Sequence, residues 1–302
     1  MTPGYEALRR GAAWLDASDR GRIVVRGRDR ARLLHNLSSN EVKKLVPGAG
    51  CYAFLLNPQG RIQADLTILC FDGHFLLDTE PDLREKVPQL IRRYIIADQV
   101  EVEDVTERSA AFAVEGPEAA ATLAALGAPI PKADYAHIAW ADATVAFVSV
   151  TDQPGYRIYL PERRQVAPGD AVWATAEDAR AVRIENGRPR YGEDIRDTTL
   201  VQETQQMHAV SFTKGCYLGQ EIVERVRAQG HVNKKLMRLE VAGGELPAPG
   251  AKLTAAGVEA GEITSSVYSP STGKVAALAY VRTPLAEAGK QLDLGGITAV
   301  VL

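Results

Sequence analysis

The sequence predicts an α+β protein that ends in a small all-β domain. Before residue 231, short β-rich runs alternate with segments whose apolar residues recur at the spacing of a helix. Beyond His231 only short β-rich runs remain, and turns containing glycine or proline separate them. A chain of 302 residues is long enough for two or three domains, each with its own core. We therefore expect residues 1–230 to form an α+β region and residues 231–302 to form a second domain.

Composition and charge restrict the classes of function. With 46% hydrophobic and 24% charged residues, the chain has the composition of an ordinary globular protein. A net charge of −3 gives no overall positive field that would attract nucleic acid. The cysteines Cys51, Cys70 and Cys216 lie far apart without CxxC spacing, which argues against a disulfide framework. Because no secretion signal and no apolar run of membrane-spanning length is evident, we expect a cytoplasmic protein without a membrane partner.

The first unit is expected to begin with a helix over Tyr5–Leu15, a strand over Arg22–Val25 and a helix through Leu33 to Leu37. Three strands follow, separated by turns rich in Asn, Asp, Pro and Gly; they are Tyr52–Leu56, Ile62–Cys70 and His74–Asp78. A longer helix over Asp82–Ile96 completes the unit.

This order of elements recurs about ninety residues later. A strand over residues 111–115 and a helix through Leu123 and Leu126 precede strands over Thr144–Val150 and Tyr156–Leu160. Two related α+β units, with one subdomain around residues 50–108, would explain the repetition. A chance likeness between two short α+β units would explain it equally well.

The C-terminal region follows a third helix that ends at Gly187, a residue type that favours the left-handed C-cap. The strands expected beyond residue 231 are Lys235–Val241, Lys252–Thr254, Ile263–Ser266, Val275–Val281 and Ile297–Leu302. Short, regularly spaced strands of this kind are typical of a small barrel or a sandwich.

The most distinctive stretch is Lys214-Gly215-Cys216-Tyr217-Leu218-Gly219-Gln220-Glu221. It leads into a predicted helix over Leu218–Gln229, with Leu218, Ile222 and Val226 on one face and Gly230 as its stop. Cys216 would then lie near a helix N-terminus and beside the Lys214 ammonium, and both features favour the thiolate. We expect a reactive thiol or a metal ligand; a small buried hydrophobic residue is the alternative.

Other charged groups could also carry function. Arg183 and Glu185 stand just before Gly187, and a carboxylate can accept two parallel N–H bonds from a pterin-like ring. A solvated charge pair at a helix end is the simpler explanation. Asp65 interrupts an apolar strand, either as a catalytic base or as an exposed strand-edge residue. The basic set Arg26, Arg28, Arg30 and Arg32 is expected to be a solvated face, and the histidine spacing supports no metal site.

The stretch from Lys214 to Glu221, followed by Arg225, resembles the signature of the YgfZ family of folate-binding proteins. These proteins are relatives of the T-protein (aminomethyltransferase) of the glycine-cleavage system. Shorter matches at Gly60-Arg61, around Glu185 and at Ser269-Pro270 extend the resemblance over nearly the whole chain. The resemblance implies a T-protein-like three-part ring, two related α+β units plus a C-terminal β-barrel, with tetrahydrofolate or another reduced folate in a central channel. It also implies folate contacts at Glu185, Arg183, Tyr191, Gln220 and Arg225, and catalytic groups at Cys216, Lys214 and Asp65.

The same resemblance implies a role in maintaining iron–sulfur enzymes and, through them, an influence on tRNA modification. Partners would be iron–sulfur client or assembly proteins, without direct nucleic-acid binding. The T-protein has two adjacent aspartates where this chain has Ala64-Asp65, which argues against aminomethyl transfer because that reaction needs a positioned carboxylate. An aminomethyltransferase is therefore the second interpretation, and a folate-independent thiol scaffold built on Cys216 is the third.

Overall fold

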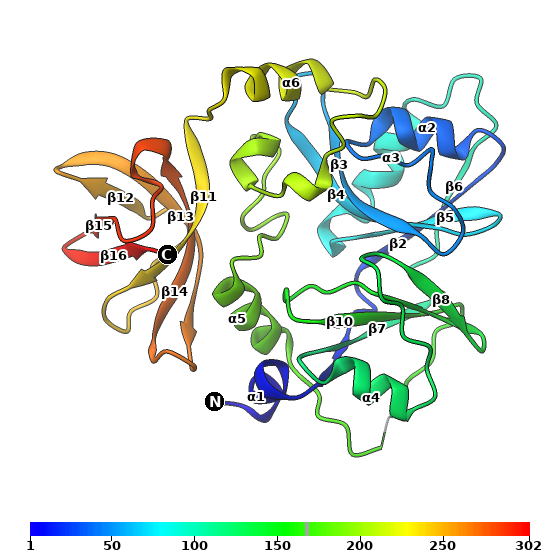
Figure 1. The fold of residues 1–302 in the computed structure, drawn as a ribbon, viewed down its shortest axis with the longest axis horizontal. Coiled ribbons are helices and arrows are strands. Elements are labelled where there is room, and N and C mark those ends of the chain that lie inside the picture. Colours follow the sequence, from blue (N-terminus) through cyan, green and yellow to red (C-terminus); the bar gives the residue numbers. More distant parts are fainter. Residues whose placement is uncertain (167–168) are drawn as a thin grey trace.

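Two five-stranded sheets and a closed β-barrel make up the computed structural model, which describes residues 1–166 and 169–302. Figure 1 shows these three parts around helix α5 (Ala176–Asn186) and the segment that follows it. The predicted α+β class, with two sheet-containing units and a C-terminal barrel, is confirmed. Short 3₁₀ turns occur at Pro81–Leu83, Val201–Thr204, Met207–Ala209 and Thr283–Leu285.

The first sheet has the strand order β3-β4-β5-β2-β6 and packs against helices α2 (Arg30–Leu37) and α3 (Lys86–Arg92). Its strands are β2 (Gly21–Arg26), β3 (Gly50–Leu56), β4 (Ile62–Cys70), β5 (His74–Thr79) and β6 (Glu101–Asp104). Helix α3 is shorter than the predicted Asp82–Ile96. Its end is tightened because the N–H groups of Tyr94 and Ile95 bond to carbonyls only three residues back.

The second sheet has the order β1-β7-β10-β9-β8 and packs against helix α4 (Ala119–Ala125). Its strands are β1 (Ala13–Asp16), β7 (Ala110–Glu115), β8 (His137–Trp140), β9 (Ala143–Ala146) and β10 (Gly155–Leu160). Because β1 pairs with β7, the chain starts in this sheet, builds the first sheet and then returns.

Two predictions in this part were wrong at their ends. The helix predicted over Tyr5–Leu15 is α1 (Pro3–Arg10) followed by strand β1, because Gly11 ends the helix and the next residues pair with β7. The strand predicted over Thr144–Val150 ends at Ala146. The carboxylate of Glu115 accepts the N–H groups of Val150 and Thr151, so these donors are satisfied outside any ladder.

The C-terminal part is a closed barrel of order β11-β14-β13-β12-β15-β16, which decides between the predicted barrel and sandwich. Its strands are β11 (Lys234–Val241), β12 (Lys252–Ala255), β13 (Val258–Ser269), β14 (Lys274–Arg282), β15 (Gln291–Leu294) and β16 (Ile297–Val301). The interior is apolar and includes Leu239, Ala277 and Val281. Strand β15 was not predicted, because it is short and its apolar signal comes mainly from the buried Leu292.

Helix α5 packs between helix α1 and the barrel. Thr175 and Asp178 form a capping box at its start, and Gly187 ends it with a φ of 82°, which confirms the predicted C-cap. Val182 packs with residues of α1, whereas Ile184 packs against the barrel. The helix therefore holds the barrel against the N-terminal region.

Helix α6 (Gln220–Gln229) leads into the barrel, and the predicted boundary near residue 231 lies in the link between α6 and β11. Of the helix residues only Val223 is buried, whereas Leu218, Ile222 and Val226, which were predicted to form the apolar face, are half-buried. The predicted stop at Gly230 is confirmed. Among the described residues, we find no helix with both the length and the apolar character needed to cross a membrane.

Candidate functional site

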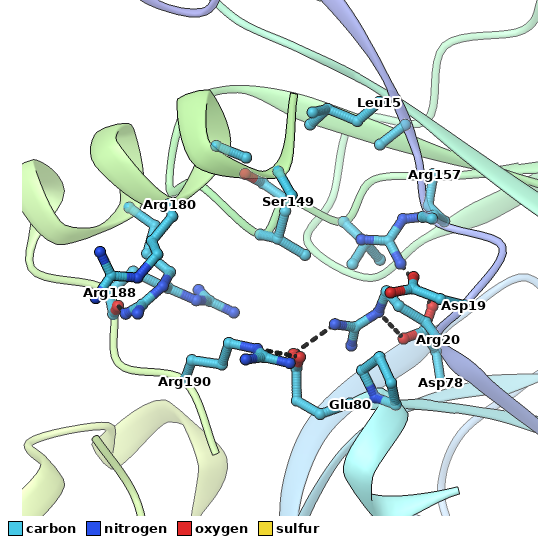
Figure 2. A pocket seen from close by; sticks show the side chains of 18 of the residues that line it. Leu15, Asp19, Arg20, Asp78, Glu80, Ser149, Arg157, Arg180, Arg188 and Arg190 are labelled. Atoms are coloured by element: carbon cyan, nitrogen blue, oxygen red, sulfur yellow. Dashed lines mark hydrogen bonds and ion pairs between the residues drawn. The ribbon is translucent and has the colours of Figure 1, made fainter. Parts of the chain in front are cut away.

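A cavity of about 550 Å³ opens between the two sheets, α5 and the loop that follows α5. Its size is within the range of pockets that hold small-molecule ligands. Figure 2 shows Arg157 and Asp78 on one side of this cavity and Arg180 and Arg188 on the opposite side. The lining is therefore contributed by segments far apart in the sequence, and it is rich in charged side chains.

Asp65 faces the cavity because of the alternation along β4. Asp65 and Thr67 both line the cavity, whereas Ala64, Leu66 and Ile68 belong to the apolar core on the other face of the strand. This arrangement changes the interpretation of Ala64. A carboxylate at that position would point into the core, so the chain keeps the carboxylate that the cavity can use.

The environment of Asp65 leaves one of its oxygens free. The hydroxyl of Tyr52 donates to Oδ2 at 2.8 Å, while Oδ1 is buried and has no hydrogen-bond partner in the described part of the chain. Burial, and then the charge of Glu80, raises the pKa of Asp65 to about 6. The Tyr52 ring is itself fixed, because His208 stacks on it at 5.4 Å and the Arg188 guanidinium lies 5.6 Å from its centroid.

An ion-pair network forms another part of the lining. Arg20 donates to Asp78 at 2.7 Å and also to Glu80, and Arg190 donates to Glu80 at 2.7 Å (Figure 2). Arg157 donates to Asp78 at 2.8 Å. Burial by itself would raise the pKa of both carboxyl groups, but the guanidinium groups, Arg20 foremost, hold these pKa values below their ordinary range.

Arg183, predicted as a folate contact, does line the cavity. Its guanidinium donates to Asp194 at 2.7 Å, to the Arg188 carbonyl at 2.8 Å and to Glu193. Asp194 also accepts hydrogen bonds from Thr264 and Ser265 of the barrel at 2.6 and 2.7 Å. Arg183 is thus engaged in joining α5 to the barrel.

Glu185, the other predicted folate contact on α5, is not among the described residues that line the cavity. The hydroxyl of Tyr5 donates one hydrogen bond shared between the two carboxylate oxygens of Glu185, at 2.7 and 2.9 Å, and the carboxylate lies 3.8 Å from the side chain of Arg9. The structure therefore places Glu185 at the contact between α5 and α1.

The remaining predicted folate contacts also lie away from the cavity lining, as far as the structure describes the chain. The buried Tyr191 accepts a hydrogen bond from Lys86 at 3.0 Å. Gln220 is the first residue of α6, and Arg225 is exposed on the same helix. Asp65 and Arg183 are the predicted site residues that the structure brings to the cavity.

Lys214 is buried, and its ammonium is used within the fold. It donates to the carbonyls of Ser38 and Asn40 at 2.6 and 2.8 Å and to that of His35. These carbonyls lie at and beyond the C-terminal end of α2, where a positive charge is favourable. Cys216 is exposed, and α6 begins at Gln220.

Other residues of the same stretch hold α6 against the β3–β4 turn. Gly219 has a φ of 82°, and a Cβ there would lie 2.6 Å from the carbonyl oxygen of Asn57. Across this contact, a Cβ on Gly60 would lie 2.7 Å from the Cβ of Ile222. Tyr217 is buried with its ring 4.9 Å from the Lys214 ammonium. The stretch is therefore an architectural element that leaves Cys216 at the surface.

Sequence reasoning missed Arg157, Asp78, Arg20 and Tyr52 as residues of the site. A signal was present for Arg157, which is a single charge between the apolar residues Tyr156 and Ile158 of a central strand. This is the same pattern that singled out Asp65. Nothing local marked Arg20, because its role depends on two carboxylates that lie 58 and 60 residues further along the chain.

Two family models match the chain. The GCVT N-terminal domain matches residues 2–214, and the glycine cleavage T-protein C-terminal barrel domain matches residues 234–296. An aminomethyltransferase from Caldanaerobacter subterraneus is 27% identical, over 96% of this chain and 82% of the relative. An aminomethyltransferase from Rubrobacter xylanophilus is 30% identical, over 92% of this chain and 78% of the relative.

Among solved structures, the glycine cleavage system aminomethyltransferase T from Bartonella henselae superposes with a TM-score of 0.88 at 21% sequence identity. The superposition covers 99% of this chain and 87% of that protein. At this identity the likeness concerns the fold, including the position of the barrel relative to the two sheets.

Proposed function

This chain belongs to the glycine-cleavage T-protein family, and we propose that it binds a reduced folate, tetrahydrofolate or a derivative of it, in the cavity beside Asp65. The observation that carries the proposal is the buried carboxylate oxygen of Asp65 without a partner in the described chain. A pterin ring presents N–H donors, and a carboxylate is the acceptor that suits them.

Titration calorimetry of the purified protein with tetrahydrofolate tests this proposal. Binding should weaken by roughly thirtyfold in Asp65→Asn, because a hydrogen bond to a buried charged group contributes about 2 kcal/mol. Asp142→Asn is the matched control, since Asp142 is an aspartate exposed at the surface and paired with Arg164. No measurable binding to the parent protein, or equal affinity in the Asp65 variant, would contradict the proposal.

We further propose that the protein is of the YgfZ type and supports iron–sulfur enzymes and, through them, tRNA modification. The support is the Lys214–Glu221 stretch, in which Lys214, Tyr217 and Gly219 are built into the fold while Cys216 is exposed. The test is the activity of iron–sulfur enzymes and the level of tRNA modification in cells whose only copy is Cys216→Ser. Loss of both, with unchanged protein abundance, is expected; full activity would leave the folate site as the functional centre.

An aminomethyltransferase is the second candidate, and the position of Asp65 favours it. The position that differs from the T-protein pattern is Ala64, which lies in the core. The cavity retains the carboxylate of Asp65, which has a pKa of about 6. A group with that pKa can exchange a proton near neutral pH. Turnover of an aminomethyl-lipoyl carrier protein with tetrahydrofolate, at about 1 per second or faster, would establish this activity.

A further inference from the structure

Arg157 is an incompletely paired cation at the cavity. It lies in the middle of β10, flanked by β7 and β9, and its side chain is 0% exposed. Its Nη1 donates to Asp78 at 2.8 Å. Its Nε and Nη2 are also buried, and neither has a hydrogen-bond partner within residues 1–166 and 169–302. Unpaired buried donors cost folding free energy, so their retention beside a cavity points to a ligand.

The charge balance around Arg157 points the same way. Asp78 and Glu80 are the carboxylates of the ion-pair network, and they are shared among Arg20, Arg157 and Arg190. The neighbouring Arg22 is 1% exposed and donates to backbone carbonyls and Ser109, which carry no charge. Arg157 therefore shares its single carboxylate partner, Asp78, with Arg20, and an anion in the cavity would give Arg157 a partner of its own.

The free edge of Arg157 selects the kind of anion. Nε–H and one N–H of Nη2 point in parallel from the same side of the planar guanidinium, a spacing that matches the two oxygens of a carboxylate. Two other arginines of the cavity are less available. Arg180 and Arg183 direct their donors to Glu193, Asp194 and backbone carbonyls.

We propose that Arg157 binds a carboxylate group of the ligand that occupies this cavity. The inference rests on the proposed function in that the same cavity receives the folate. The ligand would then be held through two groups of opposite character. An N–H group of the ligand would donate to Asp65, and a carboxylate of the ligand would accept from Arg157. The carboxylate belongs either to the glutamyl group of the folate itself or to a separate small amino acid bound beside the pterin.

The experiment compares tetrahydrofolate with tetrahydropteroate, which lacks the glutamyl group, by calorimetry. The parent protein should prefer tetrahydrofolate by about tenfold to a hundredfold, the effect of a bidentate charged hydrogen bond. Arg157→Gln and Arg157→Lys should lose this preference and keep their affinity for tetrahydropteroate, which also shows that the cavity is intact. In both variants Asp78 retains Arg20 and Tyr159 as partners. Arg188→Gln, a cavity arginine with one long bond of 3.5 Å to Asp152, is the matched comparison and should keep most of the preference.

Other outcomes separate the two sources of the carboxylate. If the parent protein binds both pterins equally, N-methylglycine should bind to its tetrahydropteroate complex and fail to bind to that of Arg157→Gln. If the preference for tetrahydrofolate survives in both Arg157 variants, the assignment to Arg157 is overturned. If neither pterin binds the parent protein, the proposed folate function fails. Binding of N-methylglycine or glutarate that requires Arg157 would then still support the carboxylate site. If neither of these compounds binds, the assignment of a carboxylate site to Arg157 is overturned as well.

Discussion

The cavity and the Lys214–Glu221 stretch differ in how completely their buried charged groups are hydrogen-bonded. At the cavity, Asp65 and Arg157 each keep buried polar atoms without a partner in the described chain. In the stretch, the buried ammonium of Lys214 donates to three backbone carbonyls. A buried charge whose hydrogen bonds are complete stabilises the fold, whereas one with free atoms beside a cavity is available to a ligand. The comparison indicates an architectural role for Lys214 and supports the proposal that a ligand binds in the cavity.

The largest effect should follow from Lys214→Ala. The substitution removes three charge-assisted hydrogen bonds and leaves their carbonyls buried, so we expect the free energy of unfolding to fall by about 3 kcal/mol. Urea denaturation measures this. Lys44→Ala is the control, because the Lys44 side chain is 79% exposed and should change stability by less than about 0.5 kcal/mol. A loss below about 1 kcal/mol at Lys214 would remove the architectural assignment.

The next effect separates Asp65 from Glu185 as the folate-binding carboxylate. Asp65→Asn should weaken tetrahydrofolate binding by about 2 kcal/mol, because an amide oxygen is a weaker acceptor than a carboxylate. Glu185→Gln should change the affinity by less than about 0.5 kcal/mol, since the Glu185 carboxylate is held by Tyr5 outside the cavity lining that the structure describes. Calorimetry on the two variants checks this. The reverse order would return the pterin contact to Glu185, as the family resemblance implies.

A pH effect of about 1 kcal/mol per unit should accompany folate binding. Asp65 has its pKa raised to about 6, and the ionised form is the better acceptor for a pterin N–H. The affinity for tetrahydrofolate should therefore fall as the pH drops below about 6, and the Asp65→Asn variant should show a flatter profile. The free energy of unfolding of the ligand-free protein should depend on pH with the opposite sign. Because the pKa of Asp65 in the folded protein lies above its ordinary value of 3.8, the contribution of Asp65 to stability is most favourable below pH 3.8 and is lost as the pH rises through 6.

How much the sequence revealed also differs between the two regions. The fold class, strands β2 to β5 of the first sheet, the Gly187 cap and the barrel follow from local periodicity and turn residues, which single segments carry. Strand β6 was not predicted. The lysine and glycines of the Lys214 stretch are just as local, but their contacts with Ser38 and Asn57 are long-range, so the sequence could not show how the stretch packs.

The cavity could be predicted only in part. Asp65 was found because a lone carboxylate in an apolar strand is unusual, and Arg183 came from the family resemblance. The pairing of Arg157 with Asp78 joins two sheets across 79 residues, which no local pattern encodes. The significance of Ala64 was likewise hidden until the strand direction showed which of the two adjacent positions faces the cavity.

The smallest effect on stability is expected at Cys216, an exposed residue of the Lys214–Glu221 stretch. Cys216→Ser should change the free energy of unfolding by less than about 0.5 kcal/mol, since the side chain is exposed and the change in volume is small. Alkylation of the native protein at neutral pH should nevertheless label Cys216 first. Cys51 and Cys70 are buried, and burial raises the pKa of the Cys51 thiol to about 12 and raises that of Cys70 as well, so both are inaccessible and protonated.

Mass spectrometry of tryptic peptides after a short exposure to iodoacetamide measures the order of labelling, with urea-unfolded protein as the control in which all the cysteines react. Equal labelling of the three cysteines in the native state, or a large loss of stability in Cys216→Ser, would show that Cys216 belongs to the packed architecture. The exposed thiol would then have no separate role, and the proposed function would depend on the cavity alone.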